Sequence, residues 1–255
     1  MNTMGLNGRN IVITGASKGL GLICARELAG CGARLVLIAR SAAKLDEIRK
    51  SLDYPDRHLC LPVDLTDVNQ LYDGVESSQK FLGEIHVVLH VVGGGLGLRD
   101  PLLPHDDLAK LFLLNIGVAA EINRLVIPRM LKNGQGNLVH VGSIASDEAT
   151  GSVGYNTVKA ALAGYVRSLG RELAKSGLVA TGILPGGFYA PSNSWERLED
   201  KAPEVVRDYI EENLPRGFLG KAEELIPMIL LLCSNDASMM AGCLVPVDAG
   251  EGRRY

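Results

Sequence analysis

Tyr155, Lys159 and Ser143 carry side chains that can move a proton. At a spacing of i, i+4, Tyr155 and Lys159 share one face of a helix. A neighbouring ammonium favours the phenolate form, so we expect Lys159 to lower the pKa of Tyr155 toward neutrality. A tyrosine tuned in this way can give or take the proton that accompanies hydride transfer at a carbonyl. Ser143, at the end of an expected strand, has a hydroxyl that can bond the same carbonyl oxygen.

A glycine-rich turn supplies a second candidate site. The run Gly15-Ala16-Ser17-Lys18-Gly19-Leu20-Gly21 lies between an expected strand, 10–14, and an expected helix. Glycines let the backbone turn sharply and let a pyrophosphate approach main-chain N–H groups at the helix N-terminus. The alternative is a tight turn with no ligand.

A Tyr-x-x-x-Lys pair alone carries little information, but here it stands in an ordered series: the glycine turn, Asn115, Ser143, Tyr155 and Lys159.

The end of the second expected strand bears on the choice of cofactor. A site that prefers NAD places an acid there to hold the ribose 2′-hydroxyl. This chain reads Ile38-Ala39-Arg40-Ser41, with no acid. The planar fork of Arg40 can hold a 2′-phosphate, and Lys18 adds a second cation at the same end of the ligand. The alternative is that both are solvated surface charges. The pattern favours NADP(H) as the cofactor.

Two alternating periodicities indicate the elements that position these residues. Short apolar runs, each bounded by Gly, Asp or Pro, suit strands buried on both faces. Longer stretches with helical spacing lie between them, which predicts βαβ units and a parallel sheet. The expected strands lie at 11–13, 35–38, 87–89, 138–141 and 179–184, and the expected helices at 20–28, 42–52, 68–82, 106–131 and 152–175.

The segment 188–217 breaks this rhythm. It is rich in Pro, Ser, Asn and charged residues and holds the sole tryptophan, Trp195. A long irregular insertion in a compact α/β domain is usually a lid or binding loop. Trp195 can stack on a substrate ring, or it can pack within the lid.

Composition excludes several classes of protein. The chain has 255 residues, 47% of them hydrophobic, and a net charge of −3, which gives no general attraction to nucleic acid or anionic membranes. Five scattered cysteines without a CxxC motif read as reduced thiols. The N-terminus is too polar for a signal peptide, and we expect no membrane span and a cytoplasmic protein. The histidines lack metal-ligand spacing, so no metal site is expected.

On these motifs the sequence resembles a short-chain dehydrogenase/reductase over essentially its whole length. The matching residues are 14–21, Asp64-Leu65-Thr66, Asn115, Gly142-Ser143, Tyr155 to Lys159, Pro185-Gly186 and Val247-Asp248. The resemblance implies an α/β fold: one doubly wound Rossmann-type domain over 1–255, with a parallel sheet of about seven strands, helices on both faces and a lid at 188–217. It also implies a homotetramer or homodimer.

The resemblance implies roles for these residues. Tyr155 would be the general acid/base and Ser143 the hydroxyl that orients the substrate. Lys159 would hold the nicotinamide ribose, and Asn115 would bend its helix and hold a water on a proton relay. Asp64 and Leu65 would flank the adenine, and Pro185, Gly186 and Phe188 would line the nicotinamide pocket. The other expected cofactor contacts are Gly15, Ser17, Lys18, Gly19, Leu20, Arg40 and Gly93.

The sequence also departs from the family pattern. The usual Asn-Asn-Ala-Gly after the fourth strand reads His90-Val91-Val92-Gly93, followed by Gly94 and Gly95. The glycines at 93–97 lie beside the expected substrate cleft, where they can admit a bulky group or form a loose loop. The position where the family often has a threonine, after Pro185-Gly186, is Ala190.

The substrate is the least determined feature. The chain resembles the 3-oxoacyl-(acyl carrier protein) reductase branch most, including the run 214–217. However, the neutral segment 133–137 lacks the basic patch that an acidic carrier needs. Three functions stay open: an NADP(H)-dependent carbonyl reductase or alcohol dehydrogenase, the same chemistry on a sugar or nucleotide-sugar, and an idle protein that senses NADP(H). Apolar residues on more than one face of the two long helices allow a subunit interface, although core packing alone could explain them: Leu111, Leu114, Val118, Leu162, Val166 and Leu169.

Overall fold

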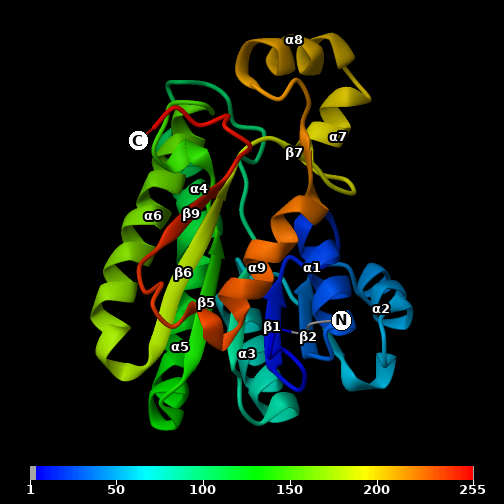
Figure 1. The fold of residues 1–255 in the computed structure, drawn as a ribbon, viewed down its shortest axis with the longest axis vertical. Coiled ribbons are helices and arrows are strands. Elements are labelled where there is room, and N and C mark those ends of the chain that lie inside the picture. The colour runs from blue at the N-terminus through cyan, green and yellow to red at the C-terminus, as the bar shows by residue number, and fades with distance from the viewer. Residues whose placement is uncertain (1–3, 255) are drawn as a thin grey trace.

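The computed structural model describes residues 4–254 and contains a seven-stranded parallel sheet (Figure 1). The strand order is β3-β2-β1-β4-β5-β6-β9. The strands are β1 (Asn10–Thr14), β2 (Arg34–Ala39), β3 (Leu59–Pro62), β4 (Val87–His90), β5 (Gly136–Val141), β6 (Leu178–Pro185) and β9 (Leu244–Val247). A separate parallel pair joins β7 (Phe188–Tyr189) to β8 (Gly220–Lys221).

Helices connect the strands and cover both faces of the sheet. They are α1 (Gly19–Gly30), α2 (Ala42–Ser51), α3 (Val68–Leu82), α4 (His105–Phe112), α5 (Val118–Asn133), α6 (Val153–Leu173), α7 (Ser194–Glu199), α8 (Pro203–Asn213) and α9 (Ile226–Cys233). A π-helical segment, Leu113–Gly117, joins α4 to α5. The predicted doubly wound α/β fold is therefore confirmed.

Alternation along the strands explains the two layers of core. Ile11, Ile13, Leu35 and Leu37 belong to the cluster that contains α1 and α9 residues, whereas Val12, Val36 and Ile38 belong to the cluster that contains α3 and α5 residues. Successive side chains of a strand point to opposite faces, so a strand that is apolar throughout feeds both layers. This is why the central strands read as continuous apolar runs.

The five predicted strands are all present, and two more complete the sheet. β3 and β9, the two edge strands, were not among the predicted strands, and their residues are only partly buried. An edge strand has a neighbour on one side only, so it needs less apolar character and gives a weaker sequence signal. The predicted lid is also more regular than expected, since β7, α7 and α8 occupy most of it and stand beyond the sheet at the top of Figure 1.

The predicted helix at 106–131 is a single helical run, His105–Asn133, interrupted by the π-helical segment. By length and composition alone this run could cross a membrane. Within the protein, 44% of its apolar 18-residue stretch is buried. Its buried face carries Asn115 and Asn123, and α5 packs on α3 and β5. A helix in the core of a globular α/β fold is also long, apolar and partly buried. The packing of α5 on α3 and β5 shows that this run is such a core helix.

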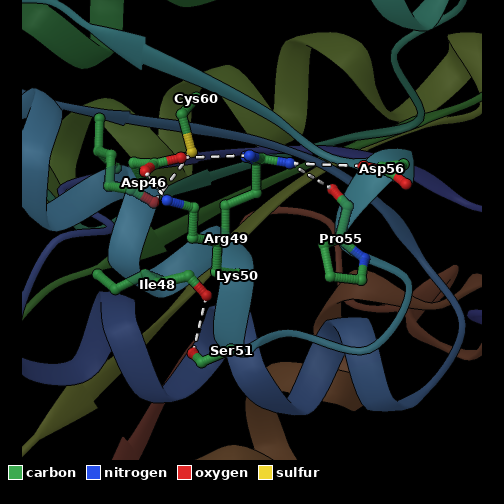
Figure 2. Close-up of polar contacts among 9 residues, drawn as sticks. Asp46, Ile48, Arg49, Lys50, Ser51, Pro55, Asp56 and Cys60 are labelled. Atoms are coloured by element: carbon green, nitrogen blue, oxygen red, sulfur yellow. Dashed lines mark hydrogen bonds and ion pairs between the residues drawn. The ribbon is translucent and has the colours of Figure 1, made fainter.

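The end of α2 is fixed by a small polar group near β3 (Figure 2). Arg49 donates to Asp46 at 3.2 Å and to the Pro55 carbonyl at 3.4 Å, and its guanidinium lies 3.8 Å from Asp56. The Cys60 thiol donates to the Leu45 carbonyl at 3.2 Å. These contacts tie α2 to the turn before β3 and to β3 itself.

The apolar residues that could join subunits or pack within the core are mostly used within the chain. Leu111, Val118, Leu162 and Val166 are buried in the protein's own core, so of the two alternatives core packing accounts for them. The physical reason is that α4, α5 and α6 pack on one another and on the sheet within the single chain. Different apolar side chains are exposed on this side of the molecule: Leu108, Phe112 and Leu113, with exposed fractions of 37%, 50% and 43%.

Candidate active site at the carboxyl edge of the sheet

The candidate residues converge on the carboxyl edge of the sheet. From β1 the order continues to β2 and β3 on one side and to β4, β5 and β6 on the other. Such a reversal opens a crevice beyond the carboxyl ends of the strands, which is where doubly wound folds bind ligands. Most of the expected site residues lie at the carboxyl ends of β1 to β6 or begin α1. Tyr155 and Lys159 come from α6, and Asn115 comes from the π-helical segment.

The glycine turn is shaped to admit a ligand. Gly15 has a φ of +71° and its N–H donates to the Ile38 carbonyl at 2.8 Å. A Cβ on Gly21 would lie 2.4 Å from the Gly15 carbonyl oxygen, so only glycine lets the turn close. The amides of Leu20 and Gly21, in the first turn of α1, have no hydrogen-bond partner among residues 4–254. Free amides at a helix N-terminus fit a pyrophosphate.

The Gly19 amide is already engaged. It donates to the Pro191 carbonyl at 2.7 Å, so the start of the lid rests on the glycine turn. On the other side of the turn, the Thr14 hydroxyl accepts from the amides of Val91 and Val92, at 3.0 and 3.3 Å. The turn is thus held between the lid and the segment after β4.

Four cations surround the expected adenosine end of the ligand. Burial lowers the pKa of Lys18, and so does repulsion from its neighbours Arg197, Lys44 and Arg40. Arg40 also lies close enough to Asp64 to help lower the pKa of that carboxyl, after the hydrogen bonds from Thr66. Such a group of like charges is stabilised by an anion, and a 2′-phosphate has the right charge. Leu65, next to Asp64, is buried.

Ser143, Tyr155 and Lys159 form a connected group. Tyr155 is partly exposed, and the Ser143 side chain lies close enough to lower the pKa of its hydroxyl. Lys159 is buried, its Nζ lies 5.6 Å from the centre of the Tyr155 ring, and the same Nζ donates to the Val141 carbonyl at 3.0 Å. Helical spacing in α6 therefore places the lysine under the tyrosine, and the end of β5 presents the serine to both.

The pKa of Tyr155 moves opposite to our expectation. Burial raises the pKa of Tyr155, and the hydrogen bond from Ser143 offsets this only in part. Burial also lowers the pKa of Lys159 to about 8. The expected lowering of the tyrosine pKa by Lys159 is therefore wrong for the protein alone, because both groups lose water and the ammonium is itself destabilised.

Asn115 braces the glycine segment after β4. It lies in the π-helical segment, where its Nδ2 donates to the carbonyls of Leu111 and Gly94, at 2.9 and 3.0 Å. Its Oδ1 accepts from the Gly94 amide at 2.9 Å. A Cβ on Gly93 would meet this Oδ1 at 2.9 Å and Lys159 Nζ at 3.3 Å, and a Cβ on Gly95 would meet the Tyr155 ring at 3.7 Å. Gly93 and Gly95 thus contact the site residues and Asn115 holds Gly94, whereas a Cβ on Gly94 or Gly97 would meet nothing within 4 Å.

His90, which stands where the family has asparagine, pairs with His140. The rings stack with centroids 4.6 Å apart and both side chains are buried. Asn123 Oδ1 lies 2.9 Å from His90 Nε2, and Asn123 Nδ2 lies 3.3 Å from His140 Nε2. An amide oxygen only accepts and an amide nitrogen only donates, so Nε2 carries the proton in His90 but not in His140. Nδ1 of His140 then donates to the Thr181 carbonyl at 3.1 Å.

The turn after β6 carries Gly186, Gly187 and Phe188 into the lid. These residues border a cavity of about 220 Å³ whose other walls come from β8, the loop before it and residues 247–249. The cavity adjoins the expected nicotinamide pocket but is not lined by Ser143 or Tyr155. Trp195 packs on Tyr209 with ring centroids 4.5 Å apart. Of the two roles considered for this tryptophan, the structure shows packing within the lid.

Three features of the site had no clear signal in the sequence. They are the pairing of the two histidines, the grip of Asn115 on Gly94, and a contact of Glu251 with the turn after β6. Each joins positions far apart in sequence, and only the register of β4 against β5 could have suggested the first.

Within residues 4–254, no group of three or more His, Cys, Asp or Glu side chains could hold a metal ion.

Comparisons with known proteins agree with this geometry. A family model described as short chain dehydrogenase matches residues 9–201, so the chain belongs to the short-chain dehydrogenase family. It is an oxidoreductase that acts on CH–OH groups with a nicotinamide cofactor.

Its relatives are similar over nearly their whole length. Gluconate 5-dehydrogenase of Gluconobacter oxydans is 29% identical over 249 residues, which cover 96% of this chain and 95% of the relative. A 3-oxoacyl-(acyl-carrier-protein) reductase of Thermotoga maritima is 27% identical over 252 residues, covering 97% and 99%. L-sorbose reductase of Gluconobacter frateurii, solved with NADPH and L-sorbose, superposes with a TM-score of 0.91 at 27% identity, covering 99% and 100%.

Proposed function

We propose that this protein is an NADP(H)-dependent carbonyl reductase, or alcohol dehydrogenase, that interconverts a ketone and a secondary alcohol with Tyr155 as general acid/base. The observation that carries the proposal is that Ser143, Tyr155 and Lys159 are grouped at the carboxyl edge of the sheet, where α1 also presents its free amides. A protein that only senses a cofactor has no use for a hydroxyl pair held over a buried ammonium.

Each residue then has a defined task. The amides of Leu20 and Gly21 hold the pyrophosphate, and Lys18 and Arg40 hold the 2′-phosphate. A bound nicotinamide supplies or accepts the hydride. Ser143 donates to the substrate oxygen and orients it toward Tyr155, whose hydroxyl gives up or takes the proton on that oxygen.

Lys159 and Asn115 support this proton transfer. The Lys159 ammonium, buried under the ring, stabilises negative charge that develops on the Tyr155 oxygen. Its pKa of about 8 keeps it charged at neutral pH. Asn115 fixes the backbone of Gly94 beside both residues. Asp64 and Leu65 flank the adenine, and the turn from Pro185 to Phe188 borders the nicotinamide.

The test compares wild type with Tyr155→Phe. Both are mixed with NADPH and a panel of ketones, L-sorbose among them, and loss of the reduced cofactor is followed. We expect Tyr155→Phe to lower kcat by about 10²-fold to 10⁴-fold, the usual share of a general acid. NADPH affinity, measured by fluorescence titration, should be unchanged. If wild type and variant are equally inert across a broad panel while both bind NADPH, the protein is a sensor and the proposal fails.

A sugar or sugar acid is the second candidate substrate. Gluconate 5-dehydrogenase and L-sorbose reductase are among the similar proteins, and both are named for polyhydroxylated substrates. A panel of free ketoses and keto-acids against simple cyclic and aliphatic ketones separates this candidate. A preference of kcat/KM for the simple ketones would remove it.

We also propose that the protein forms a homodimer or homotetramer in a reducing compartment such as the cytoplasm. Leu108, Phe112 and Leu113 form an exposed apolar face on α4 and the π-helical segment, and burying such a face stabilises a subunit contact. All five cysteines are unpaired thiols. Light scattering of wild type and Phe112→Glu tests the assembly, and a monomeric wild type would contradict it.

A further inference from the structure

Glu251, in the C-terminal segment, occupies an unusual place for a carboxylate. It is buried, with 6% of its surface exposed, and it forms none of the ion pairs within residues 4–254. Its partners are neutral: Oε2 accepts from the Gly187 amide at 2.5 Å, and Oε1 accepts from the Tyr209 hydroxyl. A carboxylate that gives up water needs such donors, so these two bonds are strong constraints on its neighbours.

The two partners belong to different parts of the site. Gly187 is in the turn after β6 that borders the expected nicotinamide pocket, and Tyr209 is in α8 of the lid. The fit at the turn is tight, because a Cβ on Gly186 would lie 2.4 Å from Glu251 Oε2. One side chain therefore fixes the backbone beside the cofactor and the lid above it.

The residues after Glu251 reach the loop that follows Ser143. Glu148 Oε1, in the loop that follows Ser143, accepts from the amides of Arg253 and Arg254 at 2.7 and 3.0 Å. The Arg254 guanidinium pairs with Asp147. In Figure 1 the C-terminal segment, in red, turns near the start of β7 and runs back over the top of α6. The segment 251–254 thus joins the lid to the loop after Ser143.

Burial and hydrogen bonding both act on Tyr209. Its pKa is raised by burial and by Glu251, so it stays a phenol that donates to the carboxylate. Its ring packs on Trp195, and Trp195 in turn lies against the turn, since a Cβ on Gly187 would be 3.6 Å from Trp195 Cε2. Tyr209, Trp195 and Glu251 therefore connect α8 of the lid to the turn.

We propose that Glu251 is a positioning residue, which orients the Gly186–Gly187 turn toward the cofactor and holds α8 of the lid in place through Tyr209. The inference rests on the proposed function for the identity of the cofactor, because the turn is assigned to the nicotinamide. The C-terminal segment, together with the lid's own contacts, then determines the position of the lid relative to the turn that borders the cofactor.

The sole tryptophan makes the proposal measurable without turnover. Trp195 emission reports the lid, and quenching of that emission by NADPH reports binding. In Glu251→Ala we expect emission at longer wavelength and an NADPH Kd raised about tenfold, since a buried charge-assisted hydrogen bond is lost. Glu251→Gln keeps an acceptor oxygen for Gly187 and should stay within about threefold of wild type. Tyr209→Phe should change the emission but leave the Kd unchanged.

The controls separate this proposal from simpler readings. Glu212→Gln, exposed on α8, should match wild type in both measurements. Glu251 is not a positioning residue if Glu251→Ala lowers the melting temperature but leaves the Trp195 emission and the NADPH Kd unchanged. The same conclusion follows if Glu251→Gln raises the NADPH Kd as much as Glu251→Ala does. If Glu251→Ala does not fold, the Tyr209→Phe emission decides, and an unchanged spectrum overturns the proposal. If wild type binds NADH and not NADPH, the cofactor assignment fails while the same titration with NADH still tests Glu251.

Discussion

Asn115 holds Gly94 by both of its backbone polar groups. Asn115 Oδ1 accepts from the Gly94 amide at 2.9 Å, and Nδ2 donates to the Gly94 carbonyl at 3.0 Å. This two-way bond mimics strand pairing, and it stands at a π-helical segment that turns the side chain toward the glycine. The backbone beside Tyr155 and Lys159 is thereby fixed by a residue of a helix that contributes no other group to the reaction.

Replacing Asn115 should therefore loosen the site without unfolding the protein. We expect Asn115→Ala to lower kcat/KM by about 10-fold to 100-fold, because small misplacements of reacting groups are costly. Hydrogen exchange at 93–97 should speed up. Asn133→Ala, at the far end of the same helical run, is the control. Unchanged exchange at 93–97 in Asn115→Ala would contradict the bracing role.

The cation group at the end of β2 should decide between the two nicotinamide cofactors. We expect Arg40→Ala to raise the Kd for NADPH by about 10-fold to 100-fold, the loss of a hydrogen bond to a charged group. The Kd for NADH should stay within about twofold, because NADH lacks the 2′-phosphate. Titrations of Arg40→Ala and Lys18→Ala check this, with exposed Arg207→Ala as control. Equal losses for both cofactors would remove the assignment to NADP(H).

Lys159 should cost stability while serving the reaction. Its pKa of about 8 lies below the ordinary 10.5, so the unfolded chain binds this proton more tightly. The contribution of Lys159 to the free energy of unfolding is therefore lowest below pH 8, and it rises as the pH goes from 8 to 10.5. At pH 7 the cost is about 3 kcal/mol for a shift of this size.

Lys159→Met should then raise the free energy of unfolding at pH 7 by about 1–3 kcal/mol, less the hydrogen bond to Val141. Activity should be lost at the same time. Urea unfolding at pH 7 and pH 10 measures the change in stability, loss of NADPH measures activity, and exposed Lys110→Met is the control. A variant less stable than wild type at pH 7 would show that the ammonium is not strained.

The buried histidine pair should make the fold sensitive to acid. Burial lowers the pKa of His140 to about 4 from an ordinary 6.5, and the pKa of His90 is also well below that value. The unfolded chain binds these protons first, so stability is fully present above pH 6.5 and falls as the pH drops toward 4. Each histidine contributes a slope of about 1.4 kcal/mol per pH unit in this range.

His90→Asn, which restores the family residue, should remove one such contribution. Chemical unfolding between pH 4.5 and 6.5 should show a shallower loss of stability in the variant. His105→Asn, on the exposed start of α4, should leave the slope as in wild type. A slope unaffected by His90→Asn would mean that this pair does not govern acid sensitivity.

Fold class and the outline of the site could be predicted from the chain alone. The strand at 87–90 is apolar on both faces, which requires a buried parallel sheet, and Tyr155 and Lys159 meet because helical spacing is local. The edge strands β3 and β9 escaped prediction, since half-buried strands carry a weaker pattern. The sequence also left open whether apolar residues such as Leu111 and Val166 join subunits or pack in the core, because an apolar residue on a helix has the same signal in both places.

Sequence by itself determined which residues can do chemistry and in what order the elements follow, because short-range periodicity is written directly into the chain. Only the tertiary structure decided what those residues experience. Burial, which depends on distant segments, reversed the expected shift of the Tyr155 pKa. Strand register stacked His90 on His140. The path of the last residues brought Glu251 to Gly187, 64 positions away. Electrostatics and positioning depend on which groups exclude water together, and that is settled only when the chain has folded.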